Sequence, residues 1–184
     1  MTRPAFRASA LERIPDLAFA RAVLEEYRPL DPAQEDVRQR MLAFLASHPK
    51  DAHLRTCLPG HFTASSLLVD RARGKALLTH HKKLDRWLQI GGHCDGDANF
   101  AHVAWREMVE ESGIEPTLIS PQPVDLDIHL IPARSSEPEH LHLDVRYLTE
   151  AAPGAREQPN EESLRLAWFD PAEDDSATDE DGVP

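Results

Sequence analysis

The sequence predicts an α+β fold with a mixed β-sheet and a helical extension at its N-terminus. Apolar residues recur at helical spacing through roughly the first 48 residues, and from His61 the pattern changes to short alternating segments typical of strands. One amphipathic helix, expected over residues 99–113, lies between earlier and later strands. Strands on both sides of a single central helix favour a mixed α+β domain over a regular βαβ array.

Two helices are expected in the N-terminal extension. The first lies within ALERIPDLAFARAVLEEY, residues 10–27, where Pro15 either breaks or starts a helical segment. The second begins with Asp31 as N-cap and Pro32 at the first helical position, and it stops near Pro49. It carries an apolar stripe that needs a partner surface: Val37, Met41, Leu42, Phe44 and Leu45. Three roles stay open for this extension, namely covering the sheet, forming a homodimer interface or shaping the pocket.

Six later segments have the period of strands. They are HFTASSLLVD (61–70), KALLTHH (75–81), RWLQI (86–90), VDLDIHLIPA (124–133), HLHLDVRYLT (140–149) and LRLAWF (164–169). The first two are joined by RARG and predict a hairpin, while the third is expected to end at Gly91 and Gly92. We therefore divide the chain into a helical extension (1–50), a catalytic domain (51–172) and an acidic tail (173–184).

Charge and composition exclude several classes of partner. The tail holds six acids and no base, which leaves −6 of the net charge of −12 on the rest of the chain. An acidic surface disfavours nucleic-acid polymers, whereas a small polyphosphate can bind where a cation supplies positive charge. No apolar run approaches the ~20 residues of a membrane span. Cys57 and Cys94 form no CxxC pair, so a cytoplasmic location is expected.

The expected central helix contains WREMVEESGI, residues 105–114, with three glutamates within five positions. At 100° per residue, Glu107, Glu110 and Glu111 share one face. The opposite face carries an apolar stripe of Ala101, Trp105, Met108 and Val109. Asn99 is the expected N-cap and Gly113 the left-handed residue at the C-terminus.

Crowded carboxylates repel one another and bind protons unless a cation joins them. Hard divalent ions such as Mg²⁺ match clustered oxygen ligands, and they support displacement at phosphorus. Arg106 can pair with Glu110 at i, i+4 and offset part of the repulsion. The helix is therefore predicted to hold a divalent metal that acts on a small phosphorylated substrate.

This segment resembles the signature of the Nudix hydrolases: a Gly, five residues, a Glu, seven residues, then Arg-Glu-apolar-x-Glu-Glu-x-Gly-apolar. Gly92 stands at the right distance, and every position from Arg106 to Ile114 matches. The resemblance extends in outline from about Phe62 to Phe169. It departs at the first Glu, which is Ala98 here; the neighbouring Asp95 and Asp97 are candidates to substitute for it.

The resemblance implies an α/β/α sandwich with a mixed sheet, and Mg²⁺- or Mn²⁺-dependent cleavage of a pyrophosphate bond in a nucleoside diphosphate linked to another moiety. It implies metal ligation by Glu107, Glu110 and Glu111, with an added oxygen from the Gly92 carbonyl. Glu110 and Glu111 would act in catalysis, and Arg106 would orient the glutamates. The general base would be a signature glutamate or a later carboxylate, for which the candidates are Glu139, Glu161 and Glu162.

Two other functions stay open. Ala98 favours a binding or regulatory module in which the fold is kept and catalysis is weakened. An isomerase acting on a diphosphate ester is the second alternative, since the fold also hosts that chemistry. Such sites depend on histidine and cysteine, for which only His93 and Cys94 are available near the signature.

Two polar strand faces are candidates for substrate binding. His140, His142 and Arg146 alternate with apolar residues along one strand, as His129 does along the preceding one. If the strands pair, these faces form one patch. It is a solvent-facing surface, a zinc site on His140 and His142 without an evident third ligand, or a substrate-binding wall in which Arg146 grips a phosphate. His93, beside Gly92, is a substrate contact or caps the turn.

Overall fold

The computed structural model describes residues 6–7, 11–81, 85–134, 137–158 and 163–170. These residues form three helices and a nine-stranded mixed sheet, so the predicted α+β class is confirmed. The elements are β1 (Phe6–Arg7), α1 (Leu17–Glu26), α2 (Pro32–Ser47), β2 (Gly60–Asp70), β3 (Lys75–His81), β4 (Arg86–Leu88), β5 (Ile90–His93), α3 (Phe100–Ser112), β6 (Leu118–Ile119), β7 (Asp125–Ile131), β8 (His140–Glu150) and β9 (Ser163–Phe169). The tail expected at 173–184 and the candidate bases Glu161 and Glu162 lie outside the described residues.

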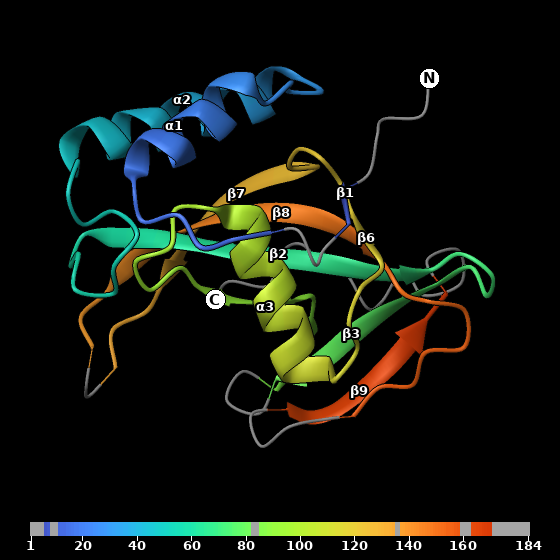
Figure 1. The fold of residues 1–184 in the computed structure, drawn as a ribbon. Helices are drawn as coiled ribbons and strands as arrows, with labels where there is room; N and C mark the ends of the chain where they lie inside the picture. The colour runs from blue at the N-terminus through green and yellow to red at the C-terminus, as the bar shows by residue number, and fades with distance from the viewer. Residues whose placement is uncertain (1–5, 8–10, 82–84, 135–136, 159–162, 171–184) are drawn as a thin grey trace.

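Two long strands, β2 and β8, form the centre of the sheet and run parallel to each other. Their register pairs His61 with His142 and Ser65 with Arg146. β7 and β6 pair antiparallel with β8, while β5 and β3 pair antiparallel with β2. β3 also pairs with β4 and β9, and in Figure 1 this part of the sheet diverges from the centre. The predicted hairpin of residues 61–70 and 75–81 is confirmed, as is the pairing of the two polar strands.

The short strand predicted over residues 86–90 is wrong in its extent. β4 ends at Leu88, and a separate strand, β5, continues through both glycines to His93. Gly91 and Gly92 pair with Ser65 and Ala64 of β2. A side chain at Gly91 would overlap Ser65. The glycine is therefore required because two strands approach closely there, and it does not mark the end of a strand.

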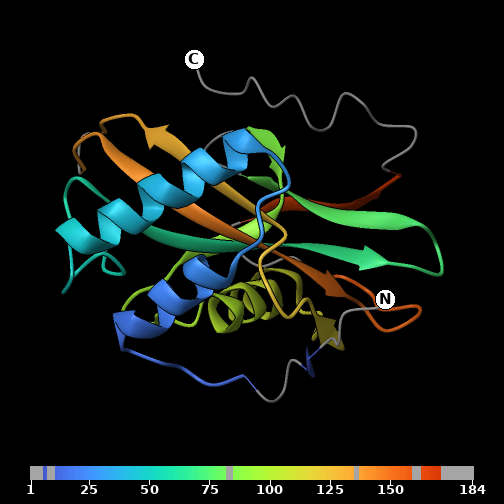
Figure 2. The ribbon, with the colours of Figure 1, turned by 90° about the horizontal axis from the view of Figure 1, so that it is seen from above.

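The N-terminal helices begin at aspartate caps, as the sequence predicts for the second of them. Asp16 accepts a hydrogen bond from the Ala18 amide, and Asp31 accepts one from the Gln34 amide. α2 lies against β7, where the Gln34 side chain both donates to the Leu126 carbonyl (3.0 Å) and accepts from the Leu126 amide (3.1 Å). Figures 1 and 2 show α1 and α2 together at one end of the molecule. The extension therefore covers part of the sheet; a homodimer interface stays a prediction.

The central helix, α3, has both predicted ends, with Asn99 as N-cap and Gly113 in the left-handed region at φ 66°. Its predicted apolar stripe is wrong in position, because Ala101, Trp105 and Val109 are only half-buried. The buried face consists of Phe100, Val103, Ala104, Met108, Glu111 and Ser112. α3 contacts β2, β5 and β8, so this face, which includes one of the signature glutamates, is turned toward the sheet.

Apolar packing joins these elements. The larger cluster takes residues from all three helices and from the strand faces that carry Phe62, Ala64, Leu143 and Val145. The neighbouring positions His61, Thr63, His142 and Asp144 therefore lie on the other face of β2 and β8, because side chains alternate along a strand. Among the described residues, the helices are all too short or too polar to cross a membrane.

Candidate metal and substrate site

Glu107 and Gly92 form the contact on which the candidate metal site is built. The Glu107 side chain, 16 % exposed, lies directly on the Cα of Gly92, where any added side chain would overlap the carboxylate. β5 supplies the glycine and α3 the glutamate. This contact explains why the position has no side chain, and metal ligation by the Gly92 carbonyl stays a prediction.

Arg106 holds this arrangement together. Its Nη2 donates to the His93 carbonyl (2.8 Å) and to Glu107 Oε1 (2.6 Å), and its Nε lies 3.9 Å from Glu110 Oε1. The predicted i, i+4 pair with Glu110 is confirmed as a loose contact. Arg106 bridges β5 and two glutamates of α3, which is the orienting arrangement that the resemblance implied.

The environment of Glu107 fits a cation. Burial raises the pKa of this carboxyl, the charge of Glu110 raises it further, and the hydrogen bond from Arg106 acts in the opposite direction. A carboxylate held in such a place is stabilised by an added positive charge. Oxygen ligands of this kind suit Mg²⁺ or Mn²⁺, so the residues present fit a hard divalent ion.

The three signature glutamates differ in exposure. Glu110 is 60 % exposed at its side chain, whereas Glu111 is 9 % exposed and lies on the buried face of α3. The prediction of one shared face opposite the apolar residues is therefore wrong for Glu111. In the described residues, the three carboxylates do not form a set with all ligand atoms within 4.8 Å of one another. An ion would have to draw them together.

The loop before α3 is covered by the N-terminal segment. The Ile14 carbonyl accepts from the Ala98 amide (2.5 Å), and the Glu12 carbonyl accepts from the Asn99 side chain (2.9 Å). Ala98 is fully buried in the larger core cluster. A glutamate at position 98 would be enclosed beneath this segment, which gives a physical reason for the departure from the signature.

The two neighbouring aspartates have other partners. Asp97 is fully buried and accepts hydrogen bonds from the Ile14 amide (3.1 Å), the Asn99 amide (2.9 Å) and the His102 ring (2.6 Å). Asp95 forms a two-point ion pair with Arg55, at 2.7 and 2.8 Å. The idea that either one substitutes for the missing glutamate is not supported by this geometry.

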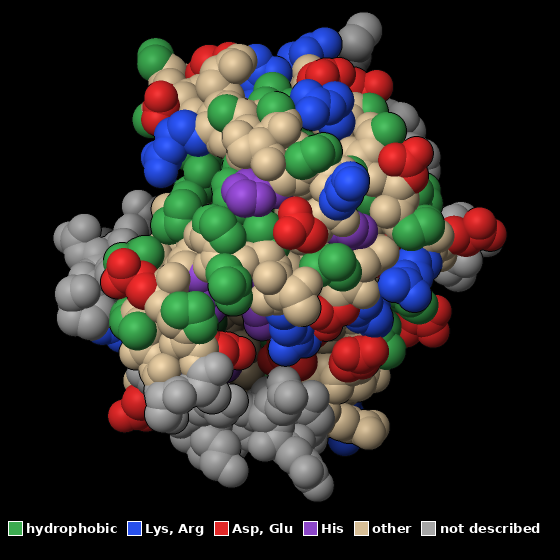
Figure 3. Space-filling model, turned by 90° about the vertical axis from the view of Figure 1, so that its left-hand side faces the viewer, with side chains coloured by type: hydrophobic (Ala, Val, Ile, Leu, Met, Phe, Trp, Pro, Cys, Tyr) green, Lys and Arg blue, Asp and Glu red, His purple; other side chains and the backbone are tan. Residues whose placement is uncertain are grey.

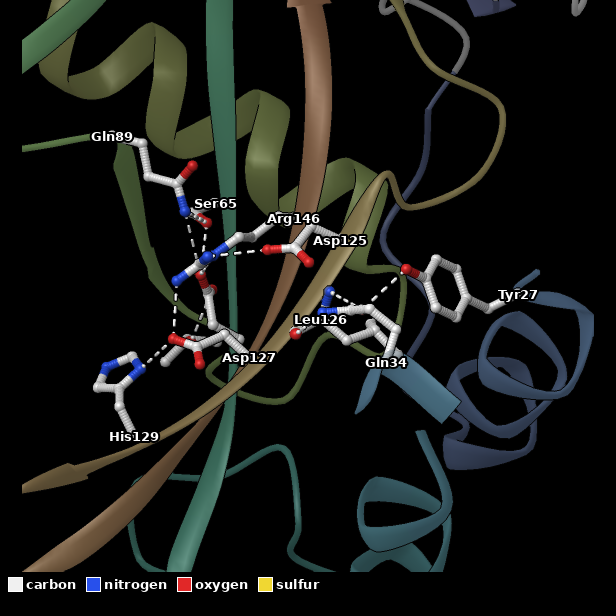
Figure 4. Close-up of polar contacts among 11 residues, drawn as sticks. Tyr27, Gln34, Ser65, Gln89, Asp125, Leu126, Asp127, His129 and Arg146 are labelled. Carbon is white, nitrogen blue, oxygen red and sulfur yellow. Dashed lines mark hydrogen bonds and ion pairs between the residues drawn. The ribbon is translucent and has the colours of Figure 1, made fainter. Parts of the chain in front are cut away.

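On the other face of the sheet, the predicted polar patch is present (Figure 4). Arg146 donates to Asp125 (2.8 Å), Asp127 (2.7 Å) and Asp144 (3.2 Å). Asp144 is also held by the hydroxyls of Thr63 (2.9 Å) and Ser65 (2.6 Å). Gln89 in turn donates to Ser65 (2.8 Å), as Figure 4 shows.

This network corrects the role predicted for Arg146. Three carboxylates surround one guanidinium, so the group carries excess negative charge and offers no free cation to a phosphate. The charges of Asp144, Asp127 and Asp125 raise the pKa of Arg146, although burial lowers it. In the described structure, Arg146 holds three aspartates of β7 and β8 together.

The histidines predicted on this patch meet others that the sequence did not place there. His142 lies next to His140, with their Nε2 atoms 3.3 Å apart, and its ring centroid is 5.5 Å from that of His129. The ring centroids of His61 and His93 are 4.9 and 5.0 Å from that of His142. We call His61, His93, His129, His140 and His142 the histidine cluster.

Burial keeps two rings of the histidine cluster uncharged. It lowers the pKa of His142 to about 2 and that of His93 to about 4; nearby histidines lower both pKa values further, and Arg55 lowers that of His93. His61, 4 % exposed, has a lowered pKa for the same first reason. Sequence reasoning missed His61; the available signal was the alternation of HFTASS, which places it on the polar face if β2 lies beside β8.

Burial disfavours the isomerase alternative. Cys94 lies fully inside the core, where burial raises the pKa of its thiol well above the usual value. An isomerase that uses this cysteine is therefore not supported. Glu139, the candidate base within the described residues, is exposed at the end of the β7–β8 connection.

Comparison with known proteins gives a family. A NUDIX domain model matches residues 60–181. Among solved structures, a NUDIX hydrolase from Clostridium perfringens is 26 % identical, with a TM-score of 0.44 over 59 % of this chain and 80 % of that one. A MutT NUDIX hydrolase from Burkholderia pseudomallei is 21 % identical, with a TM-score of 0.49 over 60 % and 82 %.

A third structure, the dihydroneopterin triphosphate pyrophosphohydrolase of E. coli, is 16 % identical, with a TM-score of 0.48 over 59 % and 80 %. No curated protein sequence matches the chain. The domain match covers well over half of the 184 residues and includes the whole signature segment. The chain therefore belongs to the NUDIX family.

Proposed function

We propose that this protein hydrolyses a pyrophosphate bond in a nucleoside diphosphate linked to another moiety, and that it does so with Mg²⁺ or Mn²⁺. The observation that carries the proposal is the placement of the Glu107 carboxylate on Gly92, fixed by Arg106 and flanked by Glu110. Its raised pKa, caused first by burial, supports a site that gains from a bound cation.

Each residue has a separate task in this proposal. Glu107, Glu110 and Glu111 would hold the ion, with the Gly92 carbonyl as a further oxygen ligand. When bound, the ion neutralises charge on the phosphate oxygens and lowers the pKa of a bound water. Arg106 keeps Glu107 in place through the His93 carbonyl, and does not itself bind the substrate. Glu110, the most exposed of the three, is the signature glutamate best placed to take a proton from water.

Substrate contacts are proposed for the histidine cluster. His93 follows Gly92 directly on β5, and its ring joins His61 and His142 on the sheet face opposite to the one on which Gly92 meets Glu107, while its backbone carbonyl accepts from Arg106 beside that glutamate. His129, His140 and His142 continue the polar face across β7 and β8. Neutral imidazoles can both donate and accept hydrogen bonds, which suits the phosphate, sugar or base of a small molecule.

A binding module with weakened catalysis is the weaker alternative. Its support was Ala98, but that residue is buried under residues 12–14 and its side chain packs in the core. Alanine at position 98 thus goes together with the covering by residues 12–14, and the three glutamates of the signature are unchanged. This favours a working hydrolase over a binding module.

The test is turnover of a panel of dinucleoside polyphosphates, nucleotide sugars, deoxynucleotides and CoA esters with Mg²⁺ or Mn²⁺. The double variant Glu110→Gln and Glu111→Gln should lose nearly all turnover of the best substrate. Glu115→Gln, a similar change at an exposed position after the helix, should retain it. Equal turnover in the double variant and the wild type would refute the metal assignment.

Cellular location and assembly belong to the same proposal. Cys57 and Cys94 are both free and buried, which agrees with the proposed cytoplasmic location. A homodimer stays a prediction, and sedimentation of the purified chain would decide it.

A further inference from the structure

The histidine cluster contains a group of three rings that resembles a ligand set. One ligand atom from each of His61, His140 and His142 lies within 4.8 Å of the others. His61 comes from β2, and His140 and His142 come from the same face of β8. The parallel register of β2 and β8 brings the three together, although they are far apart in the sequence.

Two of these rings are more than nine-tenths buried, and one lacks hydrogen-bond partners. His61 is 4 % exposed and His140 is 8 % exposed. Neither nitrogen of His61 makes a hydrogen bond of ordinary geometry within the described structure, although the Cys57 carbonyl is near enough to act on its pKa. A buried polar atom without a partner costs about 1–3 kcal/mol, so an unsatisfied imidazole in this position calls for a ligand.

The tautomer of His140 leaves the correct nitrogen available. Its Nδ1 lies 2.8 Å from the Pro138 carbonyl, which can only accept, so Nδ1 carries the hydrogen and donates it. The Nε2 atom then has a lone pair directed at His142, where it accepts a hydrogen bond from the His142 Nε2 that a metal ion would replace. Metal-binding histidines commonly donate their second nitrogen to a backbone carbonyl in this way.

The spacing between His140 and His142 agrees with tetrahedral coordination. Two nitrogens, each about 2.05 Å from a tetrahedral zinc ion, are about 3.3 Å apart. The two Nε2 atoms lie at 3.3 Å. The His61 nitrogen lies within 4.8 Å of the other two ligand atoms. Rotation of the His61 ring can shorten this distance, because it moves a ring nitrogen by more than an ångström.

We infer that His61, His140 and His142 bind a transition-metal dication of the zinc class, with a fourth position open to water or to a substrate oxygen. Three imidazole ligands suit Zn²⁺, Co²⁺ or Ni²⁺ rather than Mg²⁺. Three protein ligands are also the usual number in zinc sites that keep one position open. This site is separate from the three glutamates of α3.

His93 lies between the two sites. Its ring centroid is 5.0 Å from those of His61 and His142, while its carbonyl accepts the hydrogen bond from Arg106 that orients Glu107. On the face shown in Figure 3, a few histidine side chains reach the surface among acidic and basic ones. An ion in the histidine group would lie beside the His93 ring.

Cobalt is the probe for this inference. Co²⁺ added to metal-free, full-length protein should give the strong visible absorption of a tetrahedral site with one equivalent bound. His61→Gln and His142→Gln should each weaken Co²⁺ binding by at least about tenfold, since removing a ligand costs no less than removing a group that merely orients one. His80→Gln, on β3 outside the histidine cluster, is the matched control and should bind as the wild type does.

Two further variants separate this site from others. Glu110→Gln with Glu111→Gln should keep the cobalt absorption even if turnover is lost, so failure of the proposed hydrolase site would be distinguished from failure of this one. Cys57→Ser should also keep it. Loss of the absorption in Cys57→Ser instead would assign the ion to a second group, His48, Asp51 and Cys57, and overturn the inference.

A measurement on the wild-type chain avoids any effect of substitutions on folding. Nitrogen-15 NMR of the ten histidines before and after one equivalent of Zn²⁺ should shift the ring signals of His61, His140 and His142. Unshifted signals for these three, or cobalt binding unchanged in both His61→Gln and His142→Gln, would overturn the inference.

Discussion

Asp97 is predicted to be the residue that fixes the N-terminal segment to the signature loop. It is fully buried and accepts hydrogen bonds from three donors, which are the amides of Ile14 and Asn99 and the ring of His102. Asp97→Ala removes the two carboxylate oxygens that accept from all three donors.

The Asn99 amide bond is buried, so its loss costs about 2 kcal/mol, while the part-buried Ile14 amide costs about 1 kcal/mol because water can reach it. The His102 side chain is 17 % exposed and can turn toward solvent at little cost. The free energy of unfolding should therefore fall by about 3 kcal/mol, which is a large part of the 5–15 kcal/mol typical of a domain.

Urea unfolding followed by tryptophan fluorescence measures this change. Asp97→Asn should cost about 1 kcal/mol, because the side-chain oxygen can still accept from both amides. Asp16→Ala, which removes the exposed cap of α1, should also cost about 1 kcal/mol and serves as the control. A loss below 1 kcal/mol in Asp97→Ala would refute the idea that this carboxylate anchors the segment.

Three other predictions concern the site. Gly92→Ala should displace the Glu107 carboxylate and lower the Mg²⁺-dependent kcat about a hundredfold, with folding retained by circular dichroism; an unchanged kcat would contradict the contact. Ala98→Glu should reduce the free energy of unfolding by about 3 kcal/mol without raising turnover, because it buries an unpaired charge; a stable and faster enzyme would contradict this. Since burial lowers the pKa of His93 to about 4 and of His142 to about 2, these rings stabilise the fold above pH 6.5, and that stability is lost as the pH falls from 6.5 toward 4 and below. Urea unfolding at pH 7 and pH 5 should differ by about 2 kcal/mol after allowance for partial exposure, and the difference should shrink in the double variant His93→Gln and His142→Gln.

Local features of the fold were readable from the sequence. Asp31 and Pro32 start α2, while Asn99 and Gly113 bound α3, because helix ends depend on side chains within a few residues of them. The alternation of β7 and β8 likewise predicted the polar patch. These features rest on interactions between near neighbours in the chain.

Features that depend on distant contacts were not readable. The helical angles placed three glutamates together, but they did not say which side of α3 meets the sheet, and so the burial of Glu111 was missed. The parallel pairing of β2 and β8 brings His61 to His142 and was not predicted. Covering of Ala98 by residues 12–14 was missed for the same reason.

The central proposal is that the glutamates of α3 and the Gly92 carbonyl hold the divalent ion of a hydrolase. Anomalous diffraction from crystals soaked in Mn²⁺ tests it most directly. The account predicts a manganese peak within ligand distance of Glu107, Glu110 and Glu111. Crystals of an active enzyme that show no manganese at these carboxylates, or manganese at the histidine cluster alone, would contradict it.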